Sequence, residues 1–314
     1  MAVDFVGGSE TIRHSQFGAY RTKDAVVDGI RAKTGRRPSV DLRDPDLRIN
    51  VHLGGGFATV SIDMAGTPLH ERGAGRRAGK APLKETLAAA TLRLAGWHER
   101  VKADQGDGLW LMDPLCGSGT FLFEGLGMAL DRAPGLHRDR WGIDGWRVHD
   151  EGLFAGVLAE AKERQRAGQD RRVRVVGRDR LHAAIKGAED NAQAMGLTAF
   201  VDLAQGELHD AVPPLGPPGL LITNPPYGER MAEAVEAQAT MAELGNVLRH
   251  NFLGWSAAVF AGSIALSKRI GLRPDARVPI FNGPLDCRLL LLSISSKPVE
   301  GSGPGWKGQG DAEE

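Results

Sequence analysis

The stretch LLITNPPY, residues 220–227, decides the fold, because a short apolar run ends there in a polar, proline-rich loop. The stretch LWLMDPLCGSGT, residues 109–120, has the same arrangement with a glycine-rich loop. Short apolar runs of this kind are typical of strands buried in a parallel sheet. Open α/β sheets bind their ligands at the loops that follow the carboxyl ends of such strands. The sequence therefore predicts two ligand-binding loops at one edge of a parallel sheet.

Strand and helix patterns alternate from residue 109 onward, which predicts an α/β, doubly wound sheet. The expected strands are 109–113, 173–177, 199–204, 219–223, 256–262, 277–281 and 288–295. The expected helices are 119–131, 152–167, 180–195 and 232–252. The last two strands follow each other through Asn282-Gly283-Pro284 with no room for a crossover helix, so we expect them to pair antiparallel. That feature distinguishes methyltransferase-like sheets from fully parallel dinucleotide-binding folds.

The first part of the chain predicts a smaller α+β region. It contains a helix pattern at 22–30, strand patterns at 47–53 and 58–64 around a Gly-Gly-Gly hairpin signal, and a helix pattern at 84–94 after a basic, glycine-rich linker. The tail is rich in glycine and charge and is expected to be disordered. We therefore divide the chain into an N-terminal region 1–75, an α/β domain 76–298 and a tail 299–314.

Composition limits the classes of partner. With 314 residues, 42% hydrophobic and 25% charged, the chain is typical of a soluble globular protein of one or two domains. Its formal net charge of zero excludes a global attraction to nucleic acid, so any such contact must use local patches. The candidates are Arg72, Arg76, Arg77 and Lys80, with Arg31, Lys33, Arg36 and Arg37, although ordinary surface charge explains them equally well. The cysteines and histidines have no metal-ligand spacing, so we assign no metal, and the absence of a leader or membrane-length run favours the cytoplasm.

The glycine-rich loop predicts a cofactor site. Gly117 and Gly119 permit close approach of a ligand to the backbone at the start of a helix. The third glycine of a dinucleotide fingerprint is replaced by Leu122, which disfavours that class of cofactor. An ordinary tight turn is the alternative. The candidate cofactor-binding residues of this loop are Asp113, Pro114, Cys116, Gly117, Ser118, Gly119 and Thr120.

Acidic residues follow the next two strands. Asp179 is placed to accept hydrogen bonds from the ribose hydroxyls of a nucleoside, with an N-cap of the following helix as the alternative. Glu207 is the candidate acceptor for the amino group of a cofactor adenine, and Asp202 is its competitor. A nucleoside cofactor bound along these strand ends is the interpretation that unites them.

The loop Asn224-Pro225-Pro226-Tyr227 predicts the chemistry. An aromatic exocyclic amine is a poor nucleophile because its lone pair is delocalised. The Asn224 side-chain oxygen and the Pro225 carbonyl can accept hydrogen bonds from that amine as methyl transfer begins. Tyr227 can stack on an extruded base. The motif does not distinguish adenine N6 from guanine N2. Asn224 is also a candidate cofactor-binding residue.

On these residues the chain resembles the bacterial 23S ribosomal RNA guanine-N2 methyltransferases that carry a THUMP domain. The matching stretches are 23–28, 37–41, 69–73, 81–85, 113–120, 133–138, 224–230 and 282–287. The resemblance implies S-adenosylmethionine as cofactor, ribosomal RNA or a pre-ribosomal particle as partner, and a class I, Rossmann-like methyltransferase sheet. It also implies that the chain begins partway through THUMP and lacks the fused half that makes 7-methylguanine in many relatives. The alternatives are an adenine-N6 DNA methyltransferase, a tRNA guanine-N2 methyltransferase and a non-catalytic RNA-binding module.

Overall fold

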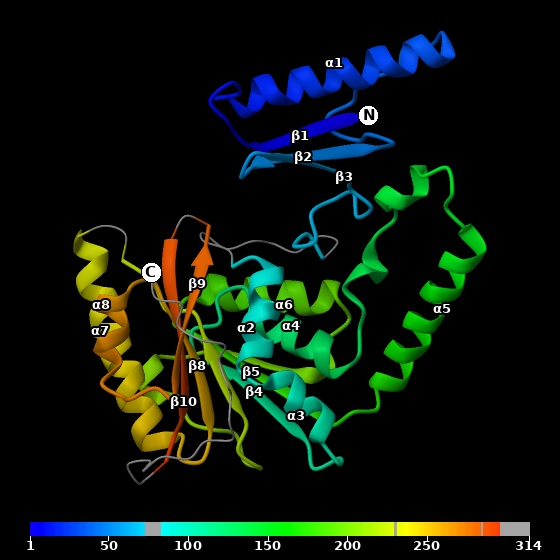
Figure 1. Ribbon diagram of the computed structural model, residues 1–314. Coiled ribbons are helices and arrows are strands. Elements are labelled where there is room, and N and C mark those ends of the chain that lie inside the picture. Colours follow the sequence, from blue (N-terminus) through cyan, green and yellow to red (C-terminus); the bar gives the residue numbers. More distant parts are fainter. Residues whose placement is uncertain (73–82, 229–230, 284, 296–314) are drawn as a thin grey trace. The chain divides into compact units, whose positions relative to one another are not determined.

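The computed structural model describes residues 1–72, 83–228, 231–283 and 285–295, with the side chains of residues 231 and 232 left out. The chain forms two compact units, which are described separately (Figure 1). Unit 1 consists of residues 1–72 and 135–160, and unit 2 of the described parts of 73–134 and 161–314. The expected boundary at residue 75 and the expected tail 299–314 lie outside the described residues.

Unit 1 contains a three-stranded sheet in the order β1-β2-β3. β1 (Ala2–Gly7) runs parallel to β2 (Arg48–Gly54), which pairs antiparallel with β3 (Phe57–Ile62). The hairpin turns at Gly55 and Gly56, whose φ values of 60° and 80° match the left-handed conformation of two-residue hairpin turns. The hairpin predicted from the glycine-rich segment is thereby confirmed.

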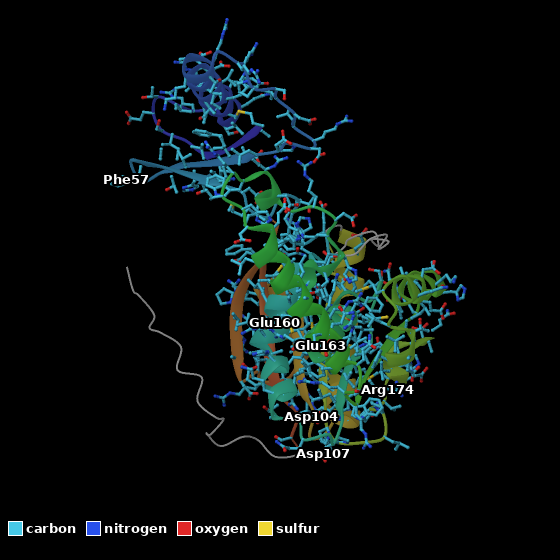
Figure 2. The ribbon with its side chains drawn as sticks, turned by 90° about the vertical axis from the view of Figure 1, so that its right-hand side faces the viewer. Phe57, Asp104, Asp107, Glu160, Glu163 and Arg174 are labelled. Atoms are coloured by element: carbon cyan, nitrogen blue, oxygen red, sulfur yellow. The ribbon has the colours of Figure 1, made fainter. Side chains whose placement is uncertain are left out.

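The helix α1 (Ser15–Thr34) supplies the crossover that the parallel strands β1 and β2 require. Its Val27 is only 2% exposed and belongs to a small core with Val3 and Ile49. The helix is longer than predicted and ends at Gly35, whose φ of 70° provides a left-handed helix end. Phe57, at the start of β3, projects away from this core and is 78% exposed (Figure 2).

A second, distant segment of the chain completes unit 1. Residues 135–160 include most of η1 (Pro134–His137), η2 (Gly142–Gly145) and the first part of α5 (Glu151–Gly168). Arg138 anchors the segment by donating hydrogen bonds to three backbone carbonyls, those of Ala65, Thr67 and Pro68. The N-terminal unit is therefore built from two stretches of sequence, a feature that the sequence pattern did not predict.

Unit 2 contains a seven-stranded sheet in the order β6-β5-β4-β7-β8-β10-β9. Its strands are β4 (Leu109–Asp113), β5 (Val173–Asp179), β6 (Val201–Gln205), β7 (Leu220–Thr223), β8 (Ser256–Ala261), β9 (Ala276–Asn282) and β10 (Leu285–Ser293). All pairs are parallel except those of β10, which is antiparallel to both β8 and β9. The predicted doubly wound sheet with an antiparallel last strand is confirmed.

Helices cover both faces of this sheet (Figure 1). One face carries α2 (Glu85–Leu94), α3 (Trp97–Ala103), α4 (Thr120–Ala129) and α6 (His182–Ala194). The other carries α7 (Met231–Asn251) and the short α8 (Ile264–Ser267). The remaining elements are the single turns η3 (Thr198–Phe200), η4 (Leu208–Asp210) and η5 (Lys268–Ile270). Among the described helices, none is long and apolar enough to cross a membrane.

The central strands are apolar on both sides because each faces two cores. In β4, Leu111 packs in the core beneath α4 and Met112 in the core beneath α7. Leu220 and Leu221 of β7 divide in the same way, and all four side chains are at most 1% exposed. Burial on both faces explains why these strands were recognisable as apolar runs without alternation.

Candidate functional site

The predicted site loops converge on the carboxyl edge of the unit 2 sheet. Because β6, β5, β4 and β7 are parallel neighbours, the loops that follow them open at the same edge. Asp113 ends β4, Asp179 ends β5, Glu207 follows β6, and Asn224 follows β7. Four separate stretches of sequence are thus brought together, as open α/β sheets do at their binding edge.

The glycine-rich loop joins β4 to α4 and requires its glycines. Gly117 and Gly119 have φ values of 53° and 81°, in the left-handed region. A Cβ at Gly119 would lie 2.4 Å from the ring of Phe123, so no larger residue fits there without moving that ring. Pro114 and Cys116 are buried beneath the loop, whereas Gly117, Ser118 and Thr120 are partly exposed. The loop is closed by a hydrogen bond from the Gly119 amide to the Cys116 carbonyl, 2.8 Å.

Two side chains from neighbouring elements fix this loop. The Gly117 amide donates to Oδ2 of Asp179, 3.0 Å, and Nδ2 of Asn191 in α6 donates to the Ser118 carbonyl, 3.0 Å. Oδ1 of Asp179 accepts from the Leu181 amide, 2.9 Å, two residues on. The alternative role of Asp179 as an N-cap does not apply, because α6 begins at His182 and its N-cap position is Leu181.

Asp113 carries a carboxyl group whose pKa is strongly shifted by its surroundings. It is 2% exposed, and burial raises its pKa to about 7. The nearby Thr223 hydroxyl and the hydrogen bond from the Leu115 amide oppose that rise, and the nearby Asp179 carboxylate adds to it. Asp113 therefore changes charge near neutral pH, and a cation bound beside it would favour its ionised form.

The two acidic candidates near β6 differ in whether a neighbouring side chain already pairs with them. Asp202 lies within the strand and forms an ion pair with Arg178, in which both guanidinium nitrogens lie 3.1 Å from the carboxylate oxygens. Glu207 lies beyond the strand end and is exposed. Because Asp202 is already engaged, Glu207 is the carboxylate at this strand end that remains available to a ligand.

Asn224 and Tyr227 are joined directly. The Tyr227 hydroxyl donates a hydrogen bond to Oδ1 of Asn224 across 2.6 Å. It also accepts from Nδ2 of Asn282 at 3.4 Å, and Asn282 ends β9. Burial raises the pKa of Tyr227, so the phenol remains a donor at physiological pH. In the same loop, Pro225 is buried and Pro226 is exposed.

The ring of Tyr227 packs against residues at the end of β8. It stacks on Phe260 with a centroid separation of 6.4 Å and an interplanar angle of 28°. A Cβ at Gly262 would lie 2.6 Å from Cγ of Tyr227, so the ring packs directly against glycine backbone. One side of the ring therefore packs against the protein. Tyr227 is partly exposed, so the remaining ring surface can contact a ligand.

Sequence reasoning missed three residues that shape this site. Asn191 is a buried polar side chain inside an otherwise ordinary helix, and Gly262 follows an apolar strand, so neither has a local motif. Asn282 belongs to the turn between the last two strands, whose antiparallel return brings it to Tyr227. The sequence analysis used that turn only to predict antiparallel pairing. In the structure, the turn also brings Asn282 within hydrogen-bonding distance of the candidate site.

Only some of the predicted nucleic-acid-binding residues lie in the part of the chain that the structure describes. Arg72 is partly exposed, and its Nε donates to the Leu69 carbonyl, 2.9 Å. Arg76, Arg77 and Lys80 lie outside the described residues. The cations near the end of α1 are exposed in unit 1, namely Arg31, Lys33, Arg36 and Arg37. In the described part of the chain, no group of three metal-ligating side chains gathers.

Two family models match the chain. Residues 72–290 match a model described as an RMKL-like methyltransferase domain, and residues 1–63 match the THUMP domain. Among curated proteins, the chain is 44% identical over 303 residues to a ribosomal RNA large subunit methyltransferase K/L of Chromohalobacter salexigens, which covers 96% of this chain and 41% of the relative. A protein of the same name from Syntrophotalea carbinolica is also 44% identical, over 96% of this chain and 42% of the relative. The chain thus spans less than half the length of these relatives.

Solved structures share the architecture. A methyltransferase crystallised in complex with SAH superposes with a TM-score of 0.78 at 29% identity, covering 95% of this chain and 75% of that chain. A methylase from Clostridium difficile superposes with a TM-score of 0.75 at 27% identity, covering 90% of this chain and 71% of that chain. Both similarities extend over nearly the whole chain.

Proposed function

The chain belongs to the family of RMKL-like methyltransferase domains, and we propose that it transfers a methyl group from S-adenosylmethionine to the exocyclic N2 amine of a guanine in 23S ribosomal RNA. The observation that carries the proposal is the position of Asn224. Its Oδ1 is held by Tyr227 in the loop after β7, next to the glycine loop after β4. A hydrogen-bond acceptor for an amine and a loop suited to a nucleoside cofactor are therefore neighbours.

The residues present fit S-adenosylmethionine. The backbone at Gly117 faces open space, since a Cβ there would meet nothing within 4 Å. The Asp179 carboxylate has lone pairs beyond its two backbone hydrogen bonds and would accept from the ribose hydroxyls. The exposed Glu207 would accept from the adenine amino group. The SAH complex of a structure 29% identical to this chain supports the same cofactor.

The cofactor supplies an electrophilic methyl group on a sulfonium. Asn224 Oδ1 and the Pro225 carbonyl accept hydrogen bonds from the guanine amine, which stabilises the positive charge that develops on its nitrogen. Pro225 and Pro226 restrict the backbone of the loop, so these two acceptors are positioned before substrate arrives. The amine proton leaves to water after transfer, so no general base is required.

Unit 1 supports an RNA substrate. Its residues 1–63 match the THUMP domain, and it carries the exposed cations at the end of α1. The basic run that includes Arg72, Arg76, Arg77 and Lys80 would add phosphate contacts. Free 23S ribosomal RNA or a pre-ribosomal particle in the cytoplasm is the proposed partner, which agrees with the names of the relatives.

Methyl transfer from radiolabelled cofactor to 23S ribosomal RNA transcripts, tRNA and DNA tests the proposal. We expect label in 23S ribosomal RNA and, after digestion, N2-methylguanosine. Labelled tRNA or 6-methyladenine would instead support one of the alternative methyltransferases. Binding of RNA without transfer would identify a non-catalytic module. The Asn224→Ala variant is the negative control, because it removes the proposed acceptor.

A further inference from the structure

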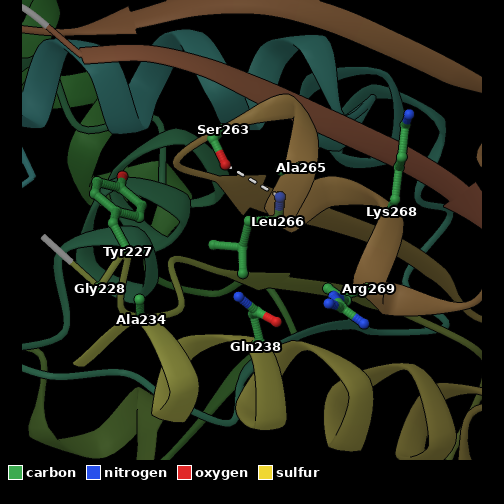
Figure 3. Close-up of a pocket in the computed structure, with 9 residues that line it drawn as sticks. All are labelled: Tyr227, Gly228, Ala234, Gln238, Ser263, Ala265, Leu266, Lys268 and Arg269. Atoms are coloured by element: carbon green, nitrogen blue, oxygen red, sulfur yellow. Dashed lines mark hydrogen bonds between the residues drawn. The ribbon is translucent and has the colours of Figure 1, made fainter. Parts of the chain in front are cut away.

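A cavity of about 520 Å³ opens beside Tyr227 within unit 2. Its volume lies in the range of about 300–1,000 Å³ that ligand pockets occupy. One wall consists of Ala234 and Gln238 from α7 (Figure 3). The opposite wall comes from the start of α8 through η5 and consists of Ser263, Ala265, Leu266, Lys268 and Arg269. Tyr227 and Gly228 close the end nearest Asn224. The cavity is thus continuous with the loop that carries the proposed chemistry.

The sheet order places this cavity opposite the cofactor side of Asn224. β7, which presents Asn224, lies between β4 with its glycine loop and β8, which leads into α8. Asp179 and Glu207 are farther away still, after β5 and β6. A cofactor held by those residues leaves the β8 side free, so the cavity lies where the second substrate enters.

The cavity wall is cationic. Lys268 and Arg269 both line it, both are exposed, and the side chain of neither makes a hydrogen bond or ion pair with another described residue. Glu236, two residues from Gln238 in α7, is committed to an ion pair with Arg180. In Figure 3, Gln238 projects from α7 toward Leu266 and Arg269, so its amide faces the cationic wall from the opposite side of the cavity. A cavity lined by unpaired cations, with an amide and an aromatic ring also in its walls, is suited to a nucleotide phosphate.

We infer that this cavity binds the backbone phosphate of a nucleotide next to the methylated guanosine, with Lys268 and Arg269 as its phosphate ligands. The inference rests on the proposed function, because it assumes that the target base is presented to Asn224. An extruded base carries its flanking phosphates with it, and an anchored phosphate holds the backbone while the base is out of its stack. The neutral overall charge of the chain makes such a local anchor more important for RNA capture.

The test compares the unaltered 314-residue chain with a Lys268→Gln/Arg269→Gln double variant. A matched control is available at the other edge of the sheet, where a cavity of about 620 Å³ is lined by Lys102 and Arg172. Asp104, which lines that second cavity, and Asp107 are labelled near the start of β4 in Figure 2. Lys102→Gln/Arg172→Gln removes the same charges without touching the proposed phosphate site.

We expect the KM for a 23S ribosomal RNA transcript to rise roughly tenfold or more in the Lys268/Arg269 variant, with kcat at saturating RNA nearly unchanged. The slope of log affinity against log salt should decrease by about 0.7 for each phosphate of single-stranded RNA that the variant no longer neutralises. Calorimetric affinity for SAH should be unchanged, and the Lys102/Arg172 control should resemble the wild type in every measurement.

An RNA affinity and salt slope equal to those of the control overturn the phosphate site. Failure of the wild-type chain to methylate any RNA overturns the proposed function instead. In that case, fluorescence anisotropy with the same transcript still decides whether Lys268 and Arg269 bind RNA phosphate. The two failures are therefore distinguishable.

Discussion

The Tyr227 hydroxyl donates a hydrogen bond to the side-chain oxygen of Asn224 across 2.6 Å. An amide oxygen has two lone pairs, so Asn224 can accept from Tyr227 and from a substrate amine at the same time. The bond selects one orientation of the Asn224 amide and directs its oxygen before substrate binds. Asn282 approaches the same hydroxyl from the end of β9 and restrains it in turn. The site therefore depends on the phenol oxygen of Tyr227 as well as on its ring.

Removal of that oxygen by Tyr227→Phe should lower the single-turnover methylation rate about fivefold. This corresponds to roughly 1 kcal/mol, the usual net contribution of one hydrogen bond. RNA affinity should change little, since the ring still packs on Phe260 and Gly262. Tyr227→Ala should have a larger effect, because base stacking of roughly 1–3 kcal/mol disappears as well. Equal rates for Tyr227→Phe and the wild type would show that the hydroxyl does not orient Asn224.

Asn224→Ala should abolish most of the methyl transfer while leaving cofactor binding nearly intact. Its oxygen is needed as the amine becomes tetrahedral, so the loss falls mainly on the transition state. By analogy with the removal of one preorganised donor in other enzymes, the rate should fall by about 10²–10³-fold. The measurement is single-turnover methylation of ribosomal RNA transcripts beside calorimetric titration with SAH. A near-wild-type rate would remove Asn224 from the proposed mechanism.

Asp179→Ala should weaken cofactor binding. Each charge-assisted hydrogen bond to the ribose contributes about 1.5–3 kcal/mol. The variant also frees the Gly117 amide, so the glycine loop loses one of its two described side-chain anchors. Asn191→Ala is the matched comparison, because it releases the other anchor without touching the ribose position. If both variants bind SAH equally, Asp179 acts through the loop, and the ribose contact is wrong.

Asp113 should make the free energy of unfolding depend on pH. Its pKa of about 7 in the folded chain exceeds the ordinary value of 3.8, so the native state retains a proton that the unfolded state has lost. The stabilisation is complete below about pH 4 and is lost as pH rises toward 7, by about 1.4 kcal/mol per pH unit. Urea unfolding at pH 5 and pH 7 should show this loss in the wild type but not in Asp113→Asn, which keeps the shape of the side chain. Parallel pH profiles for the two proteins would contradict the assignment.

The fold was largely predictable because its strands have a clear sequence pattern. β4 and β7 face a core on each side, so their apolar runs are short and unbroken, and the brief turn at Gly283 required β9 and β10 to be antiparallel. The strand ends then located Asp113, Asp179 and Asn224 at one edge. The grouping of residues 135–160 with unit 1 was not predictable, for a physical reason. Helix α5 has a helical pattern like any crossover helix, and no local signal shows that its first part belongs to unit 1.

The interactions within the site were less predictable, because they join residues distant in sequence. Asn191 reaches the Ser118 carbonyl and Asn282 reaches Tyr227 only once the sheet has formed. The sequence pattern assigned Tyr227 a role through its ring, and its hydroxyl was not expected to matter. Hydrogen bonds of this kind depend on side-chain orientation, which periodicity does not encode.

Gly262→Ala tests whether packing of the Tyr227 ring against Gly262 is needed for methyl transfer. The added Cβ would lie 2.6 Å from Cγ and 2.7 Å from Cδ1 of Tyr227, so the ring must move, and the bond to Asn224 must lengthen or break. We expect methyl transfer to fall at least as far as in Tyr227→Phe, with SAH affinity unchanged because the glycine loop lies across β7 from this position. Gly187→Ala, in α6, is the control, because a Cβ there meets nothing within 4 Å and alanine favours a helix.

Combining Gly262→Ala with Tyr227→Phe should lower the methylation rate little more than either change alone, since both act on the same hydrogen bond. Additive losses in that double variant would mean that Gly262 and the Tyr227 hydroxyl serve separate purposes.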